Sequence, residues 1–381
     1  MTSHRCDLFV FVGEKSGDLH GEKLLHELRT KNPHLTISGV GGPRMRSQGM
    51  QCTLPMEEFQ VMGFIDVLLA LPKLIYQFYF IASAIKRLQP KAVVTIDYPG
   101  FNLRLAKHLR KKGFEGKLIH YICPSVWAWG KKRIPLIAKN YDLLLSILPF
   151  EKQLFAETPL NVAFVGHPLT ERVQDSIDKP LSLPAPGKII ALFPGSRKKE
   201  ITRNLPLCLD VCRALQEHRG DLRAVLCVSD KQYLPMILTI MQEKGWNENA
   251  LDFVFSDKSH ALMKVAHLAI AKSGTVTLEL ALHRVPTVVI YGVSRLDKII
   301  AYDILRIRLP YYCLVNIIAK TEVFPEFIGP NFTFERVRAA AEELLTEPAR
   351  LKQQAACDGL IQQLGDHRTS AAAATEILNL I

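Results

Sequence analysis

This sequence gives no support for disulfide bonds, for a structural metal ion or for a dinucleotide-binding fingerprint. Its eight cysteines are scattered, and none forms a CxxC pair. Cys208 and Cys212 are four residues apart, as on one helix face, but no second pair or histidine cluster completes a zinc site. We interpret this pair as packing. The sequence also has no GxGxxG motif and no DxD pair after a strand, so we predict neither a nicotinamide cofactor nor a bound metal.

Long hydrophobic runs are scarce as well, and the first residues lack the three regions of a signal peptide, which is typical of a cytoplasmic protein. The most apolar stretch, VLLALPKLIYQFYFIASAI at Val67–Ile85, is interrupted by Pro72 and Lys73. The uncharged run after Lys73 is shorter than the ~18–20 residues that a membrane-spanning helix needs. We predict either a buried core helix or an amphipathic helix that lies in a membrane interface.

The composition is that of a folded, basic protein. Hydrophobic residues make up 48% and charged residues 22% of 381 residues, and the formal net charge is +11. This length favours two domains. A basic surface suits nucleic acid, anionic lipid or phosphorylated ligands, or only aids solubility. Zinc-finger spacing and RNP-like aromatic motifs are missing, so we predict no nucleic-acid partner.

Short apolar runs alternate with helical runs along the whole chain. Continuous apolar strands that alternate with helices are typical of a parallel sheet with both faces covered. The predicted strands are Leu8–Val12, Leu35–Val40, Ala92–Ile96, Lys117–Ile122, Asp142–Ile147, Lys188–Phe193, Leu222–Val228, Leu251–Phe255, His267–Lys272 and Pro286–Tyr291.

A loop-like segment with three prolines and a glycine, Ser176–Lys188, separates the two halves. We therefore predict an α/β protein with two Rossmann-like, doubly wound domains, at 1–175 and 176–345. Helices at 346–381 are expected to pack across both. Ligands of such sheets bind at the carboxyl ends of the strands, so we expect the two sheets to face a central cleft.

Two loops in the N-terminal half follow predicted strands. GEKSGD at Gly13–Asp18 is acidic, which suits a hydroxyl-bearing acceptor better than a phosphate. The alternative is a helix start capped by Ser16 or Asp18. The second loop is IDYPGFN at Ile96–Asn102. A carboxylate at the end of a buried strand is costly unless paired or exposed to a ligand. We therefore favour Asp97 as a general base over Asp97 as a loop cap.

Two loops in the C-terminal half lead from a strand into a helix. In LFPGSRKKE, Ser196 and Arg197 stand at a helix start, where backbone N–H groups and a guanidinium make an anion site. The alternative is a surface arginine at a turn. AKSGTVTLE, at Ala271–Glu279, predicts a second phosphate-binding helix start. Its Glu279 can take both ribose hydroxyls, or it is an ordinary helix residue.

These motifs, in this order, make the chain resemble the lipid-A-disaccharide synthase family, bacterial glycosyltransferases of the GT-B fold. The resemblance covers nearly the whole chain, and CPSVWAW at Cys123–Trp129 is its most specific block. Other matching blocks are Gly13–Asp18, GVGGPRM at Gly39–Met45, VMGFIDVL at Val61–Leu68, Ile96–Asn102, LPFEK at Leu148–Lys152, VGHPL at Val165–Leu169, Phe193–Arg197, Ser273–Glu279 and LVNIIAKTEVFPEF at Leu314–Phe327.

The resemblance implies an inverting transfer from UDP-2,3-diacylglucosamine to 2,3-diacylglucosamine 1-phosphate, which gives a β-1′,6-linked disaccharide and UDP. Asp97 is then the general base for the acceptor 6-hydroxyl, and no cofactor is needed. We assign Glu14, Ser16 and Asp18 to the acceptor side. The residues assigned to the nucleotide are Ser196, Arg197, Ser273, Gly274, Thr275, Glu279, Asn316 and Glu322.

The resemblance also implies a cytoplasmic protein, peripheral to the inner membrane of a Gram-negative bacterium, and a homodimer. Acyl-chain substrates favour the membrane-facing interpretation of Val67–Ile85. Lys15, Tyr98 and Val315 depart from the family's pattern, so acceptor detail and acyl preference are not carried over.

Two alternatives stay open on the sequence. One is another UDP-sugar enzyme of the same fold, such as a UDP-GlcNAc epimerase or a lipid-linked glycosyltransferase. An epimerase needs no lipid acceptor and leaves the apolar stretch unexplained. The other is a non-catalytic nucleotide-sugar or lipid-binding protein, which has no need of Asp97.

Overall fold

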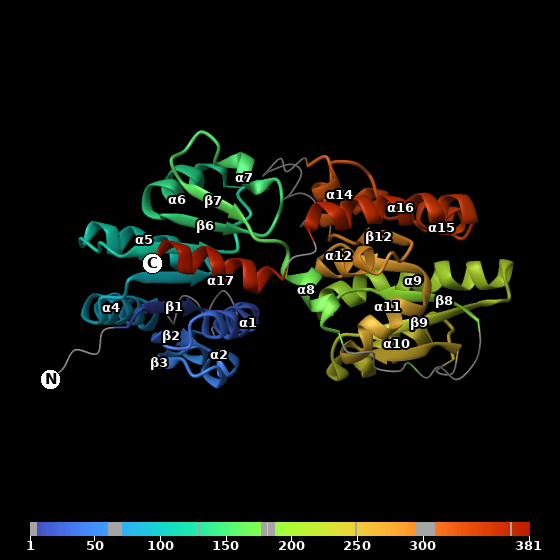
Figure 1. The fold of residues 1–381 in the computed structure, drawn as a ribbon. Coiled ribbons are helices and arrows are strands. Elements are labelled where there is room, and N and C mark those ends of the chain that lie inside the picture. Colours follow the sequence, from blue (N-terminus) through green and yellow to red (C-terminus); the bar gives the residue numbers. More distant parts are fainter. Residues whose placement is uncertain are drawn as a thin grey trace. The chain divides into compact units, whose positions relative to one another are not determined.

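The computed structural model describes residues 6–59, 71–128, 130–176, 181, 187–247, 250–294, 309–365 and 368–381. Four segments discussed above lie wholly or partly outside them: the block at Val61–Leu68, the first four residues of the apolar stretch Val67–Ile85, Trp129, and most of the predicted linker. The chain divides into two compact units, each containing one parallel sheet (Figure 1). Unit 1 comprises Met1–Glu171 and Gly365–Ile381, and unit 2 comprises Arg172–Leu364.

Unit 1 contains a seven-stranded parallel sheet in the order β3-β2-β1-β4-β5-β6-β7. The chain therefore adds strands outward from β1 in one direction, then returns to add β4 on its other side, as in a Rossmann-like fold. The strands are β1 (Leu8–Val12), β2 (Ile37–Gly41), β3 (Gln51–Pro55), β4 (Ala92–Ile96), β5 (Lys117–Tyr121), β6 (Leu143–Ser146) and β7 (Asn161–Phe164).

Helices cover both faces of this sheet because alternate strand residues point to opposite sides. Leu8, Val10 and Val12 of β1 pack with residues of the first and last helices of the chain. Phe9 and Phe11 pack on the other face with two central helices, α4 and α5. The helices of unit 1 are α1 (Lys15–Lys31), α2 (Pro43–Ser47), α4 (Leu71–Leu88), α5 (Pro99–Lys111), α6 (Ile134–Asn140), α7 (Glu151–Leu154) and α17 (Thr369–Leu380), and α8 (Pro168–Gln174) contains the boundary between the units.

Unit 2 contains a six-stranded parallel sheet in the order β10-β9-β8-β11-β12-β13. Its strands are β8 (Lys188–Phe193), β9 (Leu222–Val228), β10 (Asp252–Phe255), β11 (Ala266–Lys272), β12 (Thr287–Tyr291) and β13 (Glu326–Ile328). Its helices are α9 (Lys198–His218), α10 (Leu234–Glu243), α11 (Ser259–Val265), α12 (Thr275–Leu282), α14 (Leu314–Ala319), α15 (Phe334–Leu344) and α16 (Glu347–Leu364).

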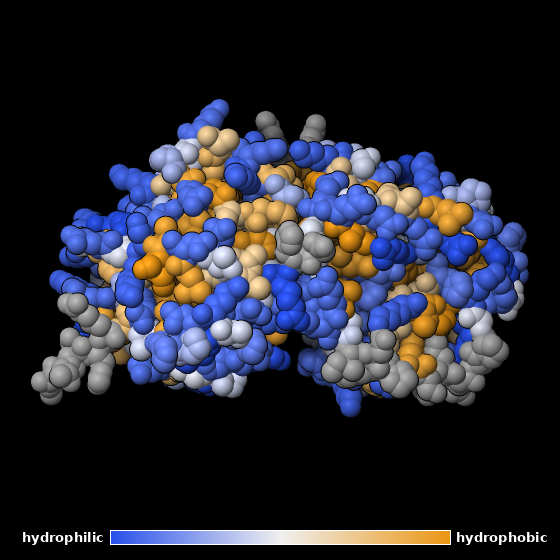
Figure 2. All heavy atoms as spheres, viewed as in Figure 1, coloured by the Kyte–Doolittle hydropathy of each residue, from blue (hydrophilic) through white to orange (hydrophobic). Residues whose placement is uncertain are grey.

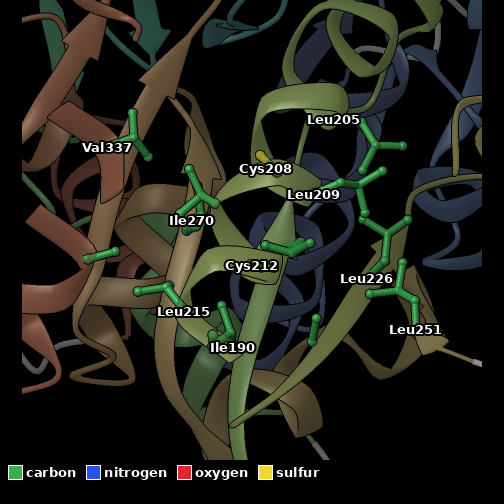
Figure 3. Close-up of a cluster of buried hydrophobic side chains, with 14 of the residues drawn as sticks. Ile190, Leu205, Cys208, Leu209, Cys212, Leu215, Leu226, Leu251, Ile270 and Val337 are labelled. Carbon is green, nitrogen blue, oxygen red and sulfur yellow. The ribbon is translucent and has the colours of Figure 1, made fainter. Parts of the chain in front are cut away.

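The core of unit 2 explains the cysteine pair. Cys208 and Cys212 are fully buried on α9, where they pack against strand residues such as Ile190 and Ile270 (Figure 3). Both thiols are packed among apolar side chains, as the packing interpretation predicts. On the face of the molecule in Figure 2, hydrophilic residues surround smaller hydrophobic areas, as expected when the large apolar clusters are internal.

All ten predicted strands are present, and the predicted pair of Rossmann-like sheets is confirmed. Three strands were not predicted: β3, β7 and β13, and each is an edge strand. Edge strands face solvent on one side, so they need no continuous apolar run. β3 has no fully buried residue, and β7 has one.

The C-terminal helices belong to different units. Helix α16 lies in unit 2, where the buried Gln353 side chain accepts a hydrogen bond from the backbone N–H of Thr287 at 2.7 Å. Helix α17 lies in unit 1 and packs on α1. Its start is held by the buried Glu171, which accepts hydrogen bonds from the hydroxyl and the backbone N–H of Ser370 at 2.6 and 3.1 Å.

Helix α4 contains most of the apolar stretch that the sequence singled out. Ile81 and Ile85 are buried in the core of unit 1. The opposite face exposes four large apolar side chains, Ile75, Tyr76, Tyr79 and Phe80, by 38–70%. The helix thus combines a core face and an apolar solvent face. Within the described residues, no helix has the length and apolar character needed to cross a bilayer.

Candidate functional site

The carboxyl ends of β1 and β4 bring two acidic loops together. These strands are neighbours in the sheet, although about eighty residues separate them in sequence. Glu14 follows β1 and Asp97 follows β4. This is the point where the order of strand addition reverses, and open parallel sheets bind their ligands there.

The side chains of Asp97 and Glu14 are in hydrogen-bond contact. The pKa of Asp97 is raised from 3.8 to about 6; burial is the largest cause, and the charge of Glu14 and its hydrogen bond add to it. The backbone N–H of Tyr98 acts in the opposite direction. The negative charge of Glu14 so close by favours the neutral form of the Asp97 carboxyl.

The backbone at Asp97 is held in an unusual conformation. Asp97 and Tyr98 have φ values of 49° and 48°, which non-glycine residues seldom adopt. The side chain of Asn102 donates a hydrogen bond to the carbonyl of Asp97 at 2.6 Å. The ring of Tyr98 lies against Gly13, where an added Cβ would come within 2.5 Å of it. Strain of this kind is retained where the surroundings fix the loop, and it clusters at functional sites.

A buried chain of neutral polar groups lies behind this loop. The hydroxyl of Thr95 is 2.7 Å from Nδ1 of His120 and 3.2 Å from the hydroxyl of Tyr141. Tyr141 in turn donates to the carbonyl of Asn102 at 3.0 Å. Burial lowers the pKa of His120 to about 3, so this histidine is neutral at physiological pH. These hydrogen bonds link β4 and β5 to Asn102, the residue that donates to the carbonyl of Asp97.

The other two residues predicted for the acceptor side have different settings. Ser16 is exposed and donates a hydrogen bond to Glu14 at 3.0 Å. Asp18 is buried and accepts hydrogen bonds from backbone N–H groups of Gly42 and Met45, at 2.8 and 3.2 Å. Ser16 therefore stays beside the carboxyl pair, whereas Asp18 fastens the loop that begins α2.

A third carboxyl group near the same sheet edge was missed by sequence analysis. Glu151 is buried after β6, and it accepts hydrogen bonds from the backbone N–H groups of Ile147 and Leu148 at 3.2 and 3.1 Å. Burial raises its pKa to about 8, and it contacts the thiol of Cys123, whose pKa burial also raises. A glutamate soon after a buried strand, in LPFEK, was the available signal.

Unit 2 has a cavity of about 390 Å³ at the carboxyl ends of β8 and β11. These strands are neighbours at the reversal point of the second sheet. Five of the residues predicted for the nucleotide line the cavity: Ser196, Arg197, Gly274, Thr275 and Glu279. In the described part of the chain, no group of three or more His, Cys, Asp or Glu side chains is arranged to hold a metal ion.

One wall of this cavity is a charged cluster at the start of α9. Glu200 accepts a hydrogen bond from the backbone N–H of Ser196 at 3.0 Å, and its other oxygen lies 3.2 Å from Nζ of Lys272. Burial acts to raise the pKa of Glu200, but the Ser196 N–H and the cations of Lys272 and Arg197 outweigh it, and the pKa is lowered. The side chain of Arg197 is 83% exposed, and its ion pair with Glu200 is long, at 3.9 Å. Its guanidinium is therefore available to a ligand.

Gly195 is required at the turn before this cluster. Its φ is +133°, and a Cβ there would lie 2.5 Å from Cβ of Glu200. Lys272 and Glu200 were not predicted. Lys272 ends a buried apolar strand, so the reasoning applied to Asp97 would have found it. Glu200 is the third residue of α9 and reaches back to a preceding N–H group, as in a capping box.

The opposite wall of the cavity contains Glu279. This carboxyl is buried on α12, and an oxygen lies 3.5 Å from the guanidinium of Arg172. Burial raises the pKa of Glu279, and Arg172 partly offsets the effect. Thr275 begins α12, and Gly274 precedes it without a side-chain cap, so N–H groups at this helix start are free to bind an anion. Arg172 was also missed by sequence analysis.

The remaining nucleotide predictions do not line this cavity. Ser273 donates to the carbonyl of Tyr312 at 3.3 Å. Asn316 is buried, and its oxygen accepts from the backbone N–H groups of Val323 and Phe324, each at 2.9 Å. Glu322 lines a second cavity of about 400 Å³ beside Tyr312. Asn316 thus holds the segment that presents Glu322.

The pKa of Asp97 leads to a prediction about stability. A carboxyl whose pKa rises from 3.8 to about 6 on folding destabilises the native state above pH 6, and the penalty fades as pH falls toward 3.8. Asp97→Asn should therefore increase the free energy of unfolding at pH 7.5 by about 2–3 kcal/mol, at ~1.4 kcal/mol per pKa unit. The gain should shrink as the pH falls from 6 toward 3.8 and be absent below it. Thermal unfolding at several pH values measures both effects, and a loss of stability at pH 7.5 would contradict a raised pKa of Asp97 in the folded protein.

Solved structures with the same fold include enzymes that act on nucleotide sugars. The structure of UDP-GlcNAc 2-epimerase from Neisseria meningitidis bound to UDP-GlcNAc aligns with a TM-score of 0.63 at 10% identity and covers 98% of both chains. The glycotransferase of kitacinnamycin aligns with a TM-score of 0.64 at 14% identity, covering 99% of this chain and 100% of that one. At such identities the likeness shows the fold alone, in agreement with the expected GT-B class.

Sequence relatives identify the family. A lipid-A-disaccharide synthase from Chlamydia muridarum is 39% identical over 383 residues, which cover 99% of this chain. The chain spans 62% of that relative's length. The lipid-A-disaccharide synthase of Anaeromyxobacter dehalogenans is 34% identical, with 98% of this chain and 97% of the relative covered. The sequence profile described as lipid-A-disaccharide synthetase matches residues 8–378. The chain therefore belongs to the lipid-A-disaccharide synthase family.

Proposed function

We propose that the chain is an inverting glycosyltransferase that condenses UDP-2,3-diacylglucosamine with 2,3-diacylglucosamine 1-phosphate. The products are the β-1′,6-linked disaccharide 1-phosphate and UDP. In this proposal unit 1 supplies the general base for the acceptor, and unit 2 binds the nucleotide. Family membership and the chemistry of the two sites support the assignment.

The observation that carries the proposal is the Asp97–Glu14 pair. A general base works best when its pKa lies near the working pH, and the pKa of Asp97 is raised to about 6. Asp97 takes the proton of the acceptor 6-hydroxyl while the oxygen of that hydroxyl attacks the anomeric carbon of the donor. The bond from the anomeric carbon to UDP breaks at the same time. Glu14 and Ser16 lie beside the base and bind acceptor hydroxyls, while Asp18 keeps the neighbouring loop in place.

The cavity of unit 2 has the groups that a departing diphosphate requires. The exposed guanidinium of Arg197, the ammonium of Lys272 and the free N–H groups at the start of α12 are all donors to an anion. Glu279 accepts from the ribose hydroxyls, and Arg172 orients it. Ser273, Asn316 and Glu322 act at the margin of this site, where Asn316 holds the segment with Glu322.

Contact with a bilayer is part of the proposal, because both substrates carry acyl chains. The exposed face of α4 presents Ile75, Tyr76, Tyr79 and Phe80. Helices α4 and α5 together contain seven Lys or Arg residues and no acidic residue. Apolar side chains among cations are typical of peripheral binding to anionic lipid. We propose that this surface contacts the cytoplasmic leaflet of the inner membrane.

Asp97→Asn should abolish turnover and leave nucleotide binding intact. We expect the rate of disaccharide formation to fall by about 10²–10⁴, the usual contribution of a general base, because Asn cannot accept the proton. Mass spectrometry of the products measures turnover, and calorimetry measures UDP affinity, which should stay within a factor of about two because Asp97 does not contact the nucleotide. Normal turnover in this variant would remove Asp97 from the mechanism, and no disaccharide from the unaltered chain would overturn the proposed reaction.

Glu14→Gln should move the pH dependence of the reaction. Its amide removes a negative charge and can donate to Asp97, so the pKa of Asp97 should fall below 6 but stay above 3.8, because burial remains. The acid limb of the kcat/KM profile should shift to lower pH. Ser16→Ala keeps the charge of Glu14 and serves as the control, with a smaller shift. An acid limb that does not move would mean that Glu14 does not set the pKa of the base.

Arg197→Ala should weaken UDP binding. Charge-assisted hydrogen bonds contribute roughly 1.5–3 kcal/mol, so the dissociation constant should rise about 10- to 100-fold. Lys198→Ala is a matched control, because it removes one positive charge from the same turn but does not line the cavity. Calorimetric titration with UDP compares the two variants. Equal effects would indicate a general field, and no effect of either would make the PGSR turn structural.

A further inference from the structure

A further cavity of unit 1 does not belong to the site described above. It has a volume of about 610 Å³ and lies between the carboxyl-terminal ends of α4 and α5. Each of these helices is followed by the start of a strand, β4 or β5. The cavity therefore lies at the amino ends of the strands, the edge of the sheet opposite to Asp97. We name it the α4–α5 cavity.

The charged side chains that line the α4–α5 cavity are two lysines and one glutamate. Lys86 of α4 and Lys112 after α5 both line it, and neither forms an ion pair with another residue in the described part of the chain. Glu115 is the acidic residue in the lining. His108 also lines the cavity. Burial is the main cause that lowers its pKa, and the positive charges of Lys112 and Lys111 lower it further.

Other groups than these lysines complete the helix ends: at α4 the carbonyl of Ile85 accepts from the backbone N–H of Gln89 at 2.9 Å. The carbonyls of Arg110 and Leu109 at the end of α5 accept from the backbone N–H groups of Gly113 and Phe114, at 3.1 and 3.0 Å. The side chain of Arg110 takes the carbonyls of Phe114 and Gly116 at 2.9 and 3.0 Å. Lys86 and Lys112 thus remain available to a ligand.

One face of α4 connects this cavity to the exposed apolar surface. Ile75, Tyr79, Ser83 and Lys86 follow one another at helical spacing of three or four residues. Tyr79, Ser83 and Lys86 line the cavity, and Ile75 and Tyr79 are at least half exposed. This face changes from apolar to cationic along the helix. A ligand that uses all of it has an anionic group attached to an apolar tail.

We propose that the α4–α5 cavity binds the headgroup of an anionic phospholipid while the face of α4 lies in the same bilayer. The phosphate is held between Lys86 and Lys112, with the hydroxyls of Tyr79 and Ser83 as donors. The inference rests on the bilayer contact proposed above and adds a discrete headgroup site, separate from the acceptor and nucleotide sites.

The test compares two double variants of the full chain that lose the same charge. K86Q/K112Q removes two cations from the cavity, and R87Q/K111Q removes two neighbouring cations that do not line it. Sedimentation with vesicles of phosphatidylcholine containing one-fifth phosphatidylglycerol measures the association constant. If the attraction to the vesicle is only diffuse, the two variants should lose the same amount of affinity, because they lose the same charge. A headgroup site predicts that K86Q/K112Q loses at least about tenfold more affinity than the control.

A third variant fills the cavity and leaves every charge in place. Ser83→Phe adds a ring at an exposed cavity residue. A headgroup site predicts a loss of the preference for phosphatidylglycerol over pure phosphatidylcholine vesicles. A surface that is only apolar predicts tighter binding to both. Thermal unfolding of every variant shows whether unit 1 is still folded, and Ser83→Phe provides a charge-independent result if a double variant fails to fold.

Equal losses in the two double variants would overturn the headgroup site and leave the bilayer contact standing. Binding of the unaltered chain to pure phosphatidylcholine as strongly as to anionic vesicles would do the same. No vesicle binding at all would also overturn the bilayer contact. Inorganic phosphate at millimolar concentration is the final arm: if it saturates the cavity and displaces the chain from vesicles, the site binds a free anion instead of a lipid.

Discussion

All strands of both sheets are parallel, and this constraint decides where chemistry can occur. A parallel strand must be left through a loop at its carboxyl end, so every strand-to-helix loop of a sheet is delivered to one edge. In unit 1 that edge collects Glu14, Asp97 and Glu151. In unit 2 it collects the Ser196 and Thr275 helix starts with Lys272. The opposite edge of unit 1, at the amino ends of the strands, has the α4–α5 cavity.

The two carboxyl-end edges place acidic side chains in opposite electrostatic settings. Burial and Glu14 raise the pKa of Asp97, whereas the backbone N–H of Ser196 and two cations overcome burial at Glu200 and lower its pKa. The pKa of Asp97, at about 6, is therefore close to neutral pH, as a general base requires. Glu200 stays ionised and keeps Lys272 in place. The same chemical group acts as a base in one setting and as a charged support in the other because its neighbours differ.

Much of this arrangement could be predicted from residue patterns, within a definable limit. Buried strands such as β1 and β4 are continuous apolar runs, and all of them were predicted. The edge strands β3, β7 and β13 were not, because half-exposed backbone needs no such run. Asp97 was predicted because it ends a buried strand. Glu200 and Arg172 were not, since a charged residue on a helix usually faces solvent, and only the fold shows which one lines a cavity.

Membership of a sequence motif does not separate residues that can touch a ligand from those that support the site. Hydrogen-bonding capacity does. Asp18 and Asn316 are buried, and backbone groups already occupy their side-chain oxygens. Replacing either would leave buried N–H groups without partners, which explains their presence without a ligand. Arg197 and Glu279 instead have capacity left on the cavity wall. A charged side chain on a cavity wall with unused hydrogen-bonding capacity gains interactions when a ligand binds. Such residues can therefore contribute to the binding free energy.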